Sequence, residues 1–183
     1  MTKAERTRAS LLRAALELFD ERGYDGTTAA AIAERAGVTE MTFFRYFPSK
    51  DSVLLADPYD PLIAEAIVHQ PAHLSPIAAA IGAIAEGWQA VPPPASSDVR
   101  DRLRIVSRTP SLRGAIAKNN AATEAAISGA LVARGASPAD ARIAAAATMA
   151  ALTAALLDWA DGADPDLGTA IHAALRVLSG GAG

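Results

Sequence analysis

The sequence predicts an all-α protein, and its composition and apolar spacing support this fold class. Alanine is heavily over-represented, whereas aromatic residues make up 5% of the chain and β-branched residues are scarce. Alanine is the best intrinsic helix former, so this composition favours helices over strands. Apolar residues recur at helical spacing, and no segment shows strand alternation bounded by hairpin turns.

Helix starts are marked by a recurring pair, in which a residue that can cap a helix directly precedes a proline. The capping oxygen accepts from a backbone N–H, and proline at the first helical position has no N–H to leave unpaired. The pairs are Asp57-Pro58, Ser75-Pro76, Thr109-Pro110, Ser137-Pro138 and Asp164-Pro165. The proline-rich run at 92–97 predicts a loop, and 180–183 a frayed end.

The first helix is predicted from about Lys3 to Arg22, with Gly23 as its stop. Either Thr27 or Thr28 caps a second helix, which ends at Gly37.

Thr39 caps a third, short helix that runs through Tyr46, and Phe47-Pro48-Ser49 then interrupts the chain. We therefore expect a domain boundary near residue 50, with one helical domain at 1–50 and a larger one at 51–183.

Composition also narrows the class of protein and its compartment. The chain has no cysteine, which excludes disulfides, thiolate metal sites and a thiol nucleophile. The N-terminus lacks a signal-peptide run, and no apolar run approaches the roughly 20 residues of a membrane span, so we expect a cytoplasmic protein with no membrane segment. The net charge is −3, but residues 1–50 hold eight Lys and Arg against seven Asp and Glu. This distribution permits DNA binding at the N-terminal end.

The second and third predicted helices, with the turn between them, have the pattern of a helix-turn-helix. Such a turn needs a glycine with positive φ and an apolar residue that fixes the helix angle, and Gly37 and Val38 supply them. The third helix would then present side chains to a major groove. These candidates are Thr39, Glu40, Met41, Thr42 and Phe43, with Thr42 ranked first. For Phe43, and likewise for Phe44 and Phe47, burial in the core is the favoured alternative.

Phosphate contacts are expected around the third helix. Tyr46 offers a hydroxyl, and Lys50 lies where a helix N-terminus favours an anion. Further candidates for this role are Thr27, Thr28 and Arg45 and, with a solvated helix end as an equal alternative, Lys3, Arg6 and Arg8.

Three runs in the first 50 residues resemble the signature of TetR-family transcriptional regulators. They are Gly-Tyr-Asp-Gly-Thr-Thr at 23–28, Ile-Ala-Glu-Arg-Ala-Gly-Val-Thr at 32–39 and Thr-Phe-Phe-Arg-Tyr-Phe-Pro-Ser-Lys at 42–50. The resemblance implies a dimeric regulator, by default a repressor, that binds a palindromic double-stranded DNA operator and is released by a small-molecule effector.

Two residues depart from the family pattern. The family usually has tyrosine in place of Phe44, and the hydroxyl of that tyrosine often contacts phosphate. Phe44 cannot make this contact, so Tyr46 and Lys50 would carry more of it. Glu40 either accepts from a cytosine amino group or points away from the DNA.

The run at 42–47, with Asp57-Pro58-Tyr59-Asp60-Pro61-Leu62 and Leu74-Ser75-Pro76, is similar to a narrower subgroup that includes the mycofactocin-system regulators. The subgroup is described as binding acyl-CoA-like ligands in its C-terminal domain. This second resemblance implies a small hydrophobic effector, with an acyl-CoA as the candidate.

Candidate effector contacts each have a structural alternative. Trp88 ends an aliphatic stripe, so it lines either a pocket or the ordinary core. Asn120 and Thr123 interrupt another apolar stripe and contact a ligand, a buried water or a neighbouring helix.

Arg104 and Arg108 follow Arg100 at helical spacing on one face. This face is either solvated or a clamp for the phosphates of a coenzyme A-like ligand.

The last two predicted helices, about Ser137–Ala160 and Asp164–Ser179, are expected to form the dimer interface, as the family resemblance also implies. Two helices from each subunit would make a four-helix bundle. The interface residues proposed are Met149, Leu152, Leu156, Trp159, Ile171 and Leu175.

Taken as a whole, the sequence indicates a transcriptional regulator rather than an enzyme. It has no nucleophile–base pair, metal cluster or glycine-rich phosphate loop, so we expect no cofactor and no metal. The alternative is a helical ligand carrier or interaction protein that does not use its helix-turn-helix on DNA. Binding of DNA at low salt would discriminate between the two, because non-specific affinity is electrostatic.

Overall fold

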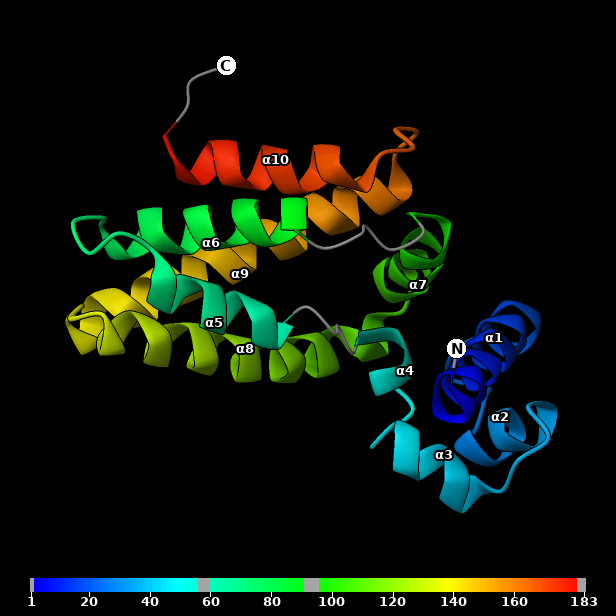
Figure 1. Ribbon diagram of the computed structural model, residues 1–183. Helices are drawn as coiled ribbons and strands as arrows, with labels where there is room; N and C mark the ends of the chain where they lie inside the picture. Colours follow the sequence, from blue (N-terminus) through cyan, green and yellow to red (C-terminus); the bar gives the residue numbers. More distant parts are fainter. Residues whose placement is uncertain (1, 56–59, 91–95, 181–183) are drawn as a thin grey trace. The chain divides into compact units, whose positions relative to one another are not determined.

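The computed structural model describes residues 2–55, 60–90 and 96–180, and every regular element in these ranges is a helix (Figure 1). The predicted all-α fold class is confirmed. The helices are α1 (Lys3–Arg22), α2 (Ala29–Arg35), α3 (Glu40–Tyr46), α4 (Ser52–Leu55), α5 (Asp60–His69), α6 (Pro76–Ala90), α7 (Ser96–Arg108), α8 (Arg113–Ala133), α9 (Pro138–Asp161) and α10 (Leu167–Leu178). A short 3-10 turn, η1 (Pro110–Leu112), precedes α8.

These helices form two units, each of which includes a segment from elsewhere in the chain. The contiguous boundary expected near residue 50 did not anticipate this arrangement. Within the first unit the Ser111 hydroxyl donates to the Asp25 carboxylate at 2.8 Å, a contact between residues that are 86 positions apart. Helical spacing carries no information about such a contact. The units are Met1–Ala56 with Asp101–Ile116, and Asp57–Arg100 with Ala117–Gly183.

Several predicted helix starts are confirmed by their hydrogen bonds. The Ser137 side chain accepts from the Asp140 N–H at 3.1 Å at the start of α9. At the start of α6, the Ser75 hydroxyl accepts from the Ala78 N–H at 3.3 Å. Of the two threonines proposed for α2, Thr28 is the cap.

Other predicted starts were wrong or lie elsewhere. The helix expected at Asp164-Pro165 begins at Leu167, because Asp166 caps it by accepting from the Gly168 N–H at 2.9 Å. Thr109-Pro110 opens the 3-10 turn without a side-chain cap bond. The Asp57-Pro58 pair and most of the predicted loop at 92–97 lie outside the described residues, and Ser96 and Ser97 already belong to α7.

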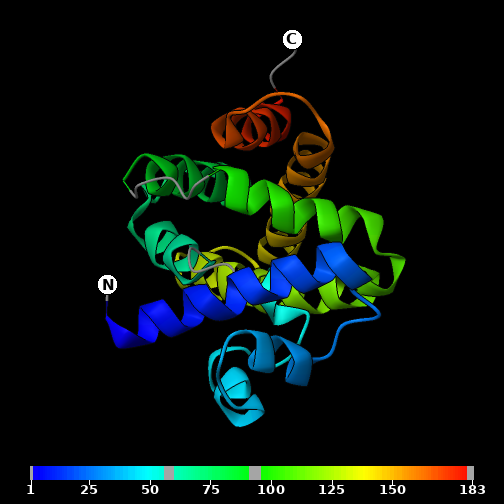
Figure 2. The same ribbon diagram turned by 90° about the vertical axis from the view of Figure 1, so that its right-hand side faces the viewer.

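The first unit packs its N-terminal helices around a small apolar core. Helix α2 contacts both α1 and α3 (Figures 1 and 2). The core contains Leu11, Ala14, Ala15, Leu18 and Phe19 from α1, Ile32 and Ala33 from α2, Phe43 and Phe47 from α3 and its end, and Val53 and Leu54 from α4. Burial of these side chains supplies most of the driving force that holds the short helices in place.

The core of the second unit lies between α5, α6, α8, α9 and α10. Helix α9 packs against α10 and α6, and α5 packs against α6. Many of the buried side chains are alanines, which allow the helix axes to approach closely. The larger ones include Ile67, Ile84, Ile127, Leu131, Met149, Leu152 and Leu175.

Four of the six residues predicted at the dimer interface are instead buried inside the subunit. Only 6–9% of the surface of Met149, Leu152, Trp159 and Leu175 is exposed, so those four assignments are wrong. Ile171 packs against the same core and Leu156 is half-buried. Because α9 is apolar on nearly all sides, its spacing could not say which face turns inward.

The bounds of α9 agree with the helix predicted at about Ser137–Ala160, but its apolar character exceeds the sequence expectation. Its 24 residues make it, by length and composition, a helix that could cross a membrane, although no apolar run of that size was expected. The core helix of a soluble protein passes the same test, and eight residues of α9 are buried in the subunit.

Candidate nucleic-acid interface

The turn between α2 and α3 has the geometry that a helix-turn-helix requires. Gly37 has φ +70°, in the left-handed region that glycine adopts without strain. The Val38 N–H donates to the Ala33 carbonyl at 2.9 Å, and the Gly37 N–H donates to the Glu34 carbonyl at 3.0 Å. These bonds close the end of α2 and fix the direction in which α3 leaves.

Helix α3 is held by the aromatic side chains on its inner face. Phe43 is fully buried and Phe47 is 1% exposed, with their ring centroids 5.8 Å apart. Phe43 therefore cannot contact DNA. Its assignment as a groove residue was wrong, and the favoured alternative, burial in the core, is what the structure shows.

The outward face of α3 carries Glu40, Met41, Phe44 and Arg45, all of them exposed. The core position favoured for Phe44 was therefore wrong, because 48% of its surface is exposed. Thr42, ranked first among the groove candidates, is half-buried beside this face. Its hydroxyl lies 3.0 Å from that of Thr39, whose side chain also accepts from the Thr42 N–H at 3.2 Å. These two contacts fix the first turn of α3.

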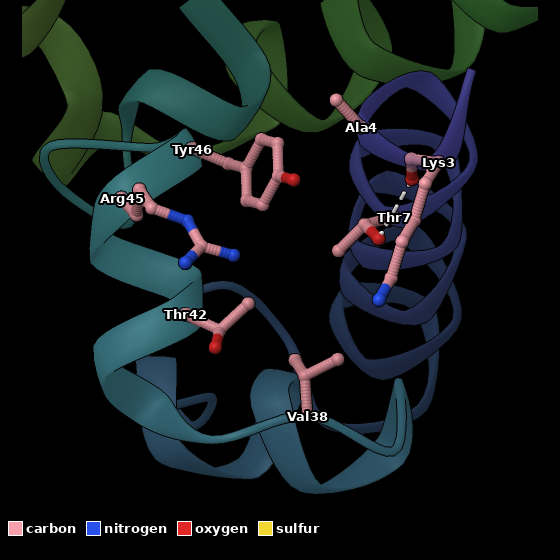
Figure 3. A pocket seen from close by; sticks show the side chains of 7 residues that line it. All are labelled: Lys3, Ala4, Thr7, Val38, Thr42, Arg45 and Tyr46. Carbon is pink, nitrogen blue, oxygen red and sulfur yellow. Dashed lines mark hydrogen bonds between the residues drawn. The ribbon is translucent and has the colours of Figure 1, made fainter.

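A cleft of about 510 Å³ lies between the N-terminal end of α1 and the side of α3 that carries Thr42, Arg45 and Tyr46 (Figure 3). The Lys3 side chain extends along one wall, and Arg45 and Tyr46 lie on the opposite wall (Figure 3). The Thr7 hydroxyl donates to the Lys3 carbonyl at 3.0 Å. The full lining is Lys3, Ala4, Thr7, Val38, Thr42, Arg45 and Tyr46.

This cleft brings together predicted and unpredicted residues. Arg45 lies 5.2 Å from the centre of the Tyr46 ring, so the ring helps to orient its guanidinium. Lys3 was predicted as a DNA contact or a solvated helix end with equal weight, and Thr7 was not predicted. Their i, i+4 spacing places them on one side of α1, but nothing in the sequence says that this side faces α3.

Two residues that were predicted to contact phosphate serve the fold instead. Thr27 is 2% exposed, and its hydroxyl contacts the Gly23 carbonyl at 2.9 Å and the Leu18 carbonyl at 3.2 Å. The ammonium of Lys50 donates to the Tyr24 carbonyl at 2.7 Å and to the Thr27 carbonyl at 2.8 Å. Both assignments were wrong, because these donors satisfy backbone carbonyls of α1 and of the loop that follows it.

The Lys50 ammonium also lies 3.9 Å from the centre of the Tyr24 ring. Burial lowers the pKa of Lys50, although Asp25 and Asp51 oppose this shift. Burial, reinforced by the same two carboxylates, raises the pKa of Tyr24 to about 12. At neutral pH the Tyr24 ring is therefore uncharged, and the Lys50 side chain over this ring stabilises the loop.

The effector candidates of the second unit are partly accounted for by the fold. The Asn120 amide donates to the Thr153 hydroxyl on α9 at 2.9 Å, which is the neighbouring-helix alternative. Thr123 is 5% exposed. The Trp88 indole nitrogen lies 3.3 Å from the position that a Cβ on Gly168 would take, so this half-buried ring packs against α10.

The arginine face of α7 is divided between the two units. Arg100 donates to the carbonyls of Gly162, at 3.0 Å, and Asp164, and lies 4.2 Å from the centre of the Trp159 ring. Half-buried Arg104 and exposed Arg108 belong to the first unit. Their joint role as a phosphate clamp stays a prediction. The Arg100 guanidinium already donates to carbonyls just after the end of α9.

Comparison with known proteins covers most of the chain. Residues 11–56 match the family "Bacterial regulatory proteins, tetR family", and residues 74–183 match the "MftR C-terminal domain". The transcriptional regulator TcmR of Streptomyces glaucescens is 43% identical over 83 residues, which is 44% of this chain and 37% of TcmR. The match therefore spans little more than a third of the length of that relative.

Two solved structures resemble nearly the whole chain. NalD, the secondary repressor of the MexAB-OprM multidrug efflux pump in Pseudomonas aeruginosa, has a TM-score of 0.57 at 25% identity, covering 99% of this chain and 98% of NalD. Thermus thermophilus FadR, a repressor solved in complex with lauroyl-CoA, has a TM-score of 0.50 at 23% identity, covering 95% and 94%. At that identity the second likeness shows the fold alone.

Proposed function

Because this chain belongs to the TetR family of bacterial regulatory proteins, we propose that it is a ligand-responsive repressor. It binds a palindromic DNA operator as a dimer and leaves it when a small hydrophobic effector binds the second unit. The observation that carries this proposal is the arrangement around α3. Its inner side is anchored by Phe43, its outer face is exposed, and Lys3 and Arg45 flank the cleft beside it.

One side of α3 contacts the DNA backbone and the other contacts the bases. The cleft holds two cations and three hydroxyls, which suit a phosphate of the DNA backbone; they come from Lys3, Arg45, Thr7, Thr42 and Tyr46. Thr28, exposed at the start of α2, contributes a further phosphate contact. The outward residues of α3 then reach the base edges in the major groove, where sequence is read.

Dimerisation uses the outer faces of α9 and α10 rather than the faces predicted from spacing. Ile143 on α9 is 68% exposed and Val177 on α10 is 64% exposed. Two copies of each helix would bury these side chains in a four-helix bundle related by a two-fold axis. The recognition helices of the dimer would then enter grooves about one helical turn apart.

Release follows from a two-state equilibrium. The effector binds one conformation of the dimer more tightly, and only this difference in affinity can shift the population away from the DNA-binding state. We propose a long-chain acyl-CoA as the effector, with Trp88, Asn120 and Thr123 of the second unit as candidate contacts. The match of 74–183 to the MftR C-terminal domain supports this choice. A repressor of this kind acts in the cytoplasm.

The test is a fluorescence-anisotropy titration with DNA from the upstream region of the gene, with and without a long-chain acyl-CoA. Specific binding that the acyl-CoA reverses supports the whole proposal. Specific binding without that reversal keeps the repressor and rejects the effector. Absence of binding even at low salt would favour the ligand-carrier alternative, which the net charge of −3 and the exposed Glu40 allow.

Matched variants separate the contacts. Lys3→Met should reduce the slope of log affinity against log salt by about 0.9, the value for one phosphate contact. Lys118→Met on α8 makes the same chemical change at an exposed site of the second unit and should leave the slope unchanged. Ile143→Asp should convert the dimer to monomer in light scattering, with Val132→Asp on α8 as the control. A dimer that survives Ile143→Asp would reject this interface.

A further inference from the structure

Helix α3 exposes apolar surface in a unit that otherwise keeps its large apolar side chains inside. Among the described residues of the first unit, the exposed large hydrophobic side chains are Met41, 83% exposed, and Phe44, 48% exposed. They lie three positions apart, so they are neighbours on one face of the helix. Single exposed apolar side chains are ordinary, but a pair on the outward face of a recognition helix has no core to fill.

The position of Phe44 is set by the core beneath it. Its ring meets that of fully buried Phe43 edge-on, at 90° and 5.3 Å between centroids. This geometry is favourable for aromatic pairs and limits how far the Phe44 ring can turn. Phe44 is therefore held outward before DNA arrives, while Met41, with three rotatable bonds, can adapt to a neighbouring surface.

The surroundings of this pair fit double-stranded DNA. Arg45 follows Phe44 in sequence, so a cation borders the apolar face, and Arg45 also lines the cleft that holds Lys3. Neither Met41 nor Phe44 can accept or donate a strong hydrogen bond at a base edge. The apolar group that the major groove presents is the 5-methyl group of thymine.

We infer that Met41 and Phe44 form an apolar pair that reads thymine methyl groups in each operator half-site. This inference rests on the proposed function, because it assumes that α3 enters the major groove. It assigns to Phe44 a base contact in place of the phosphate contact that a tyrosine hydroxyl would make. Thymine at one or two positions of each half-site then determines specificity.

The test removes the methyl group and nothing else. An operator is first selected from a random duplex library, and each thymine of the selected site is then replaced by deoxyuridine, one at a time. At the thymines that α3 contacts, the affinity should fall about fourfold per methyl group, since a buried methylene contributes about 0.8 kcal/mol and 1.4 kcal/mol corresponds to tenfold. Thymines elsewhere in the site should show no effect.

Variants of the pair assign the contact. In Met41→Ala and Phe44→Ala, the loss of affinity on replacing thymine by deoxyuridine should be smaller at the position that each side chain contacts. At that position the effects of the side-chain truncation and of the base replacement should not be additive. Phe44→Tyr keeps the ring and should retain the penalty. Val132→Ala, at a 40% exposed valine of α8, is the matched control and should leave every penalty unchanged. Circular dichroism melting checks that each variant folds.

The outcomes distinguish this inference from the function on which it rests. A selected operator that wild type binds equally well with deoxyuridine at every thymine would overturn the inference and leave the repressor intact. A selected half-site that requires no thymine would overturn it as well. Failure to select any sequence, with only salt-sensitive binding or none, would instead reject the proposed function.

Discussion

Replacement of Lys50 by methionine separates a role in the fold from a role in phosphate binding. The ammonium of Lys50 bridges the carbonyls of Tyr24 and Thr27 at 2.7 and 2.8 Å and lies 3.9 Å from the Tyr24 ring centre. Methionine has a similar length but no donor, so Lys50→Met would leave both carbonyls without this partner. We expect a destabilised first unit and an unchanged number of phosphate contacts.

The magnitude follows from these contacts. Each hydrogen bond to a charged group contributes about 1.5–3 kcal/mol, and a cation over an aromatic ring adds about 0.5–1 kcal/mol near the surface. The cost of partly desolvating the ammonium, which also lowers the pKa of Lys50, offsets a share of this sum. A net loss of about 2 kcal/mol, or a fall in Tm of roughly 4–8 °C for a chain of this size, is the expected result.

Two measurements on the same variants decide the question. Thermal melting followed by circular dichroism gives the stability, and anisotropy titrations at several salt concentrations give the salt slope. Lys50→Met should lower Tm and leave the salt slope unchanged. Lys3→Met should leave Tm unchanged and reduce the salt slope, and Lys118→Met should change neither quantity. A Lys50→Met protein with wild-type Tm and a slope reduced by about 0.9 would show that the lysine binds phosphate after all.

Three further changes test the packing. Gly82→Ala in α6 places a Cβ against the amide oxygen of buried Gln70, whereas Gly87→Ala on the same helix meets open space. The Gln70 side chain must shift and give up its hydrogen bond to Glu86, so urea denaturation should find the first variant less stable than the second by about 1 kcal/mol; equal stabilities would contradict this. The pKa of Tyr24 is raised to about 12 in the folded state, so its phenol loses its proton at a higher pH than in the unfolded chain. Its contribution to stability is therefore complete below about pH 10 and declines as the pH rises toward 12; Tyr24→Phe should reduce that decline, and identical alkaline profiles would argue against it. Phe43→Ala should lower the free energy of unfolding by about 3–5 kcal/mol, because the ring is fully buried. Unchanged stability with selective loss of DNA binding would instead show that Phe43 contacts DNA in the groove.

Local sequence signals predicted local structure well. The first helix was expected from about Lys3 to Arg22 and has those bounds, because Gly23, with φ +75°, ends it. The turn glycine, Gly37, was also predicted, since a positive φ is a local requirement of the backbone that glycine meets. Caps such as Ser137 depend on atoms within three residues and were predicted for the same reason.

The direction in which a side chain faces was predicted less well. Lys50 and Thr27 look like exposed donors in the sequence, but their partners are carbonyls up to 26 residues away. On α9, spacing identified Met149 and Leu152 as apolar positions but assigned them to the wrong side. A helix rich in alanine has little contrast between its faces, so its orientation depends on neighbouring helices.

By itself, the sequence determined the all-α fold class, most helix starts, the helix-turn-helix and the family. All of these depend on interactions within a few residues or on a run of residues that is read without gaps. Only the tertiary structure decided that Lys3 and Thr7 face α3, that Met41 and Phe44 point outward, and that 101–116 joins the first unit. The physical reason is that these facts depend on contacts between segments distant in the chain, and periodicity places a residue on a face without specifying what that face meets.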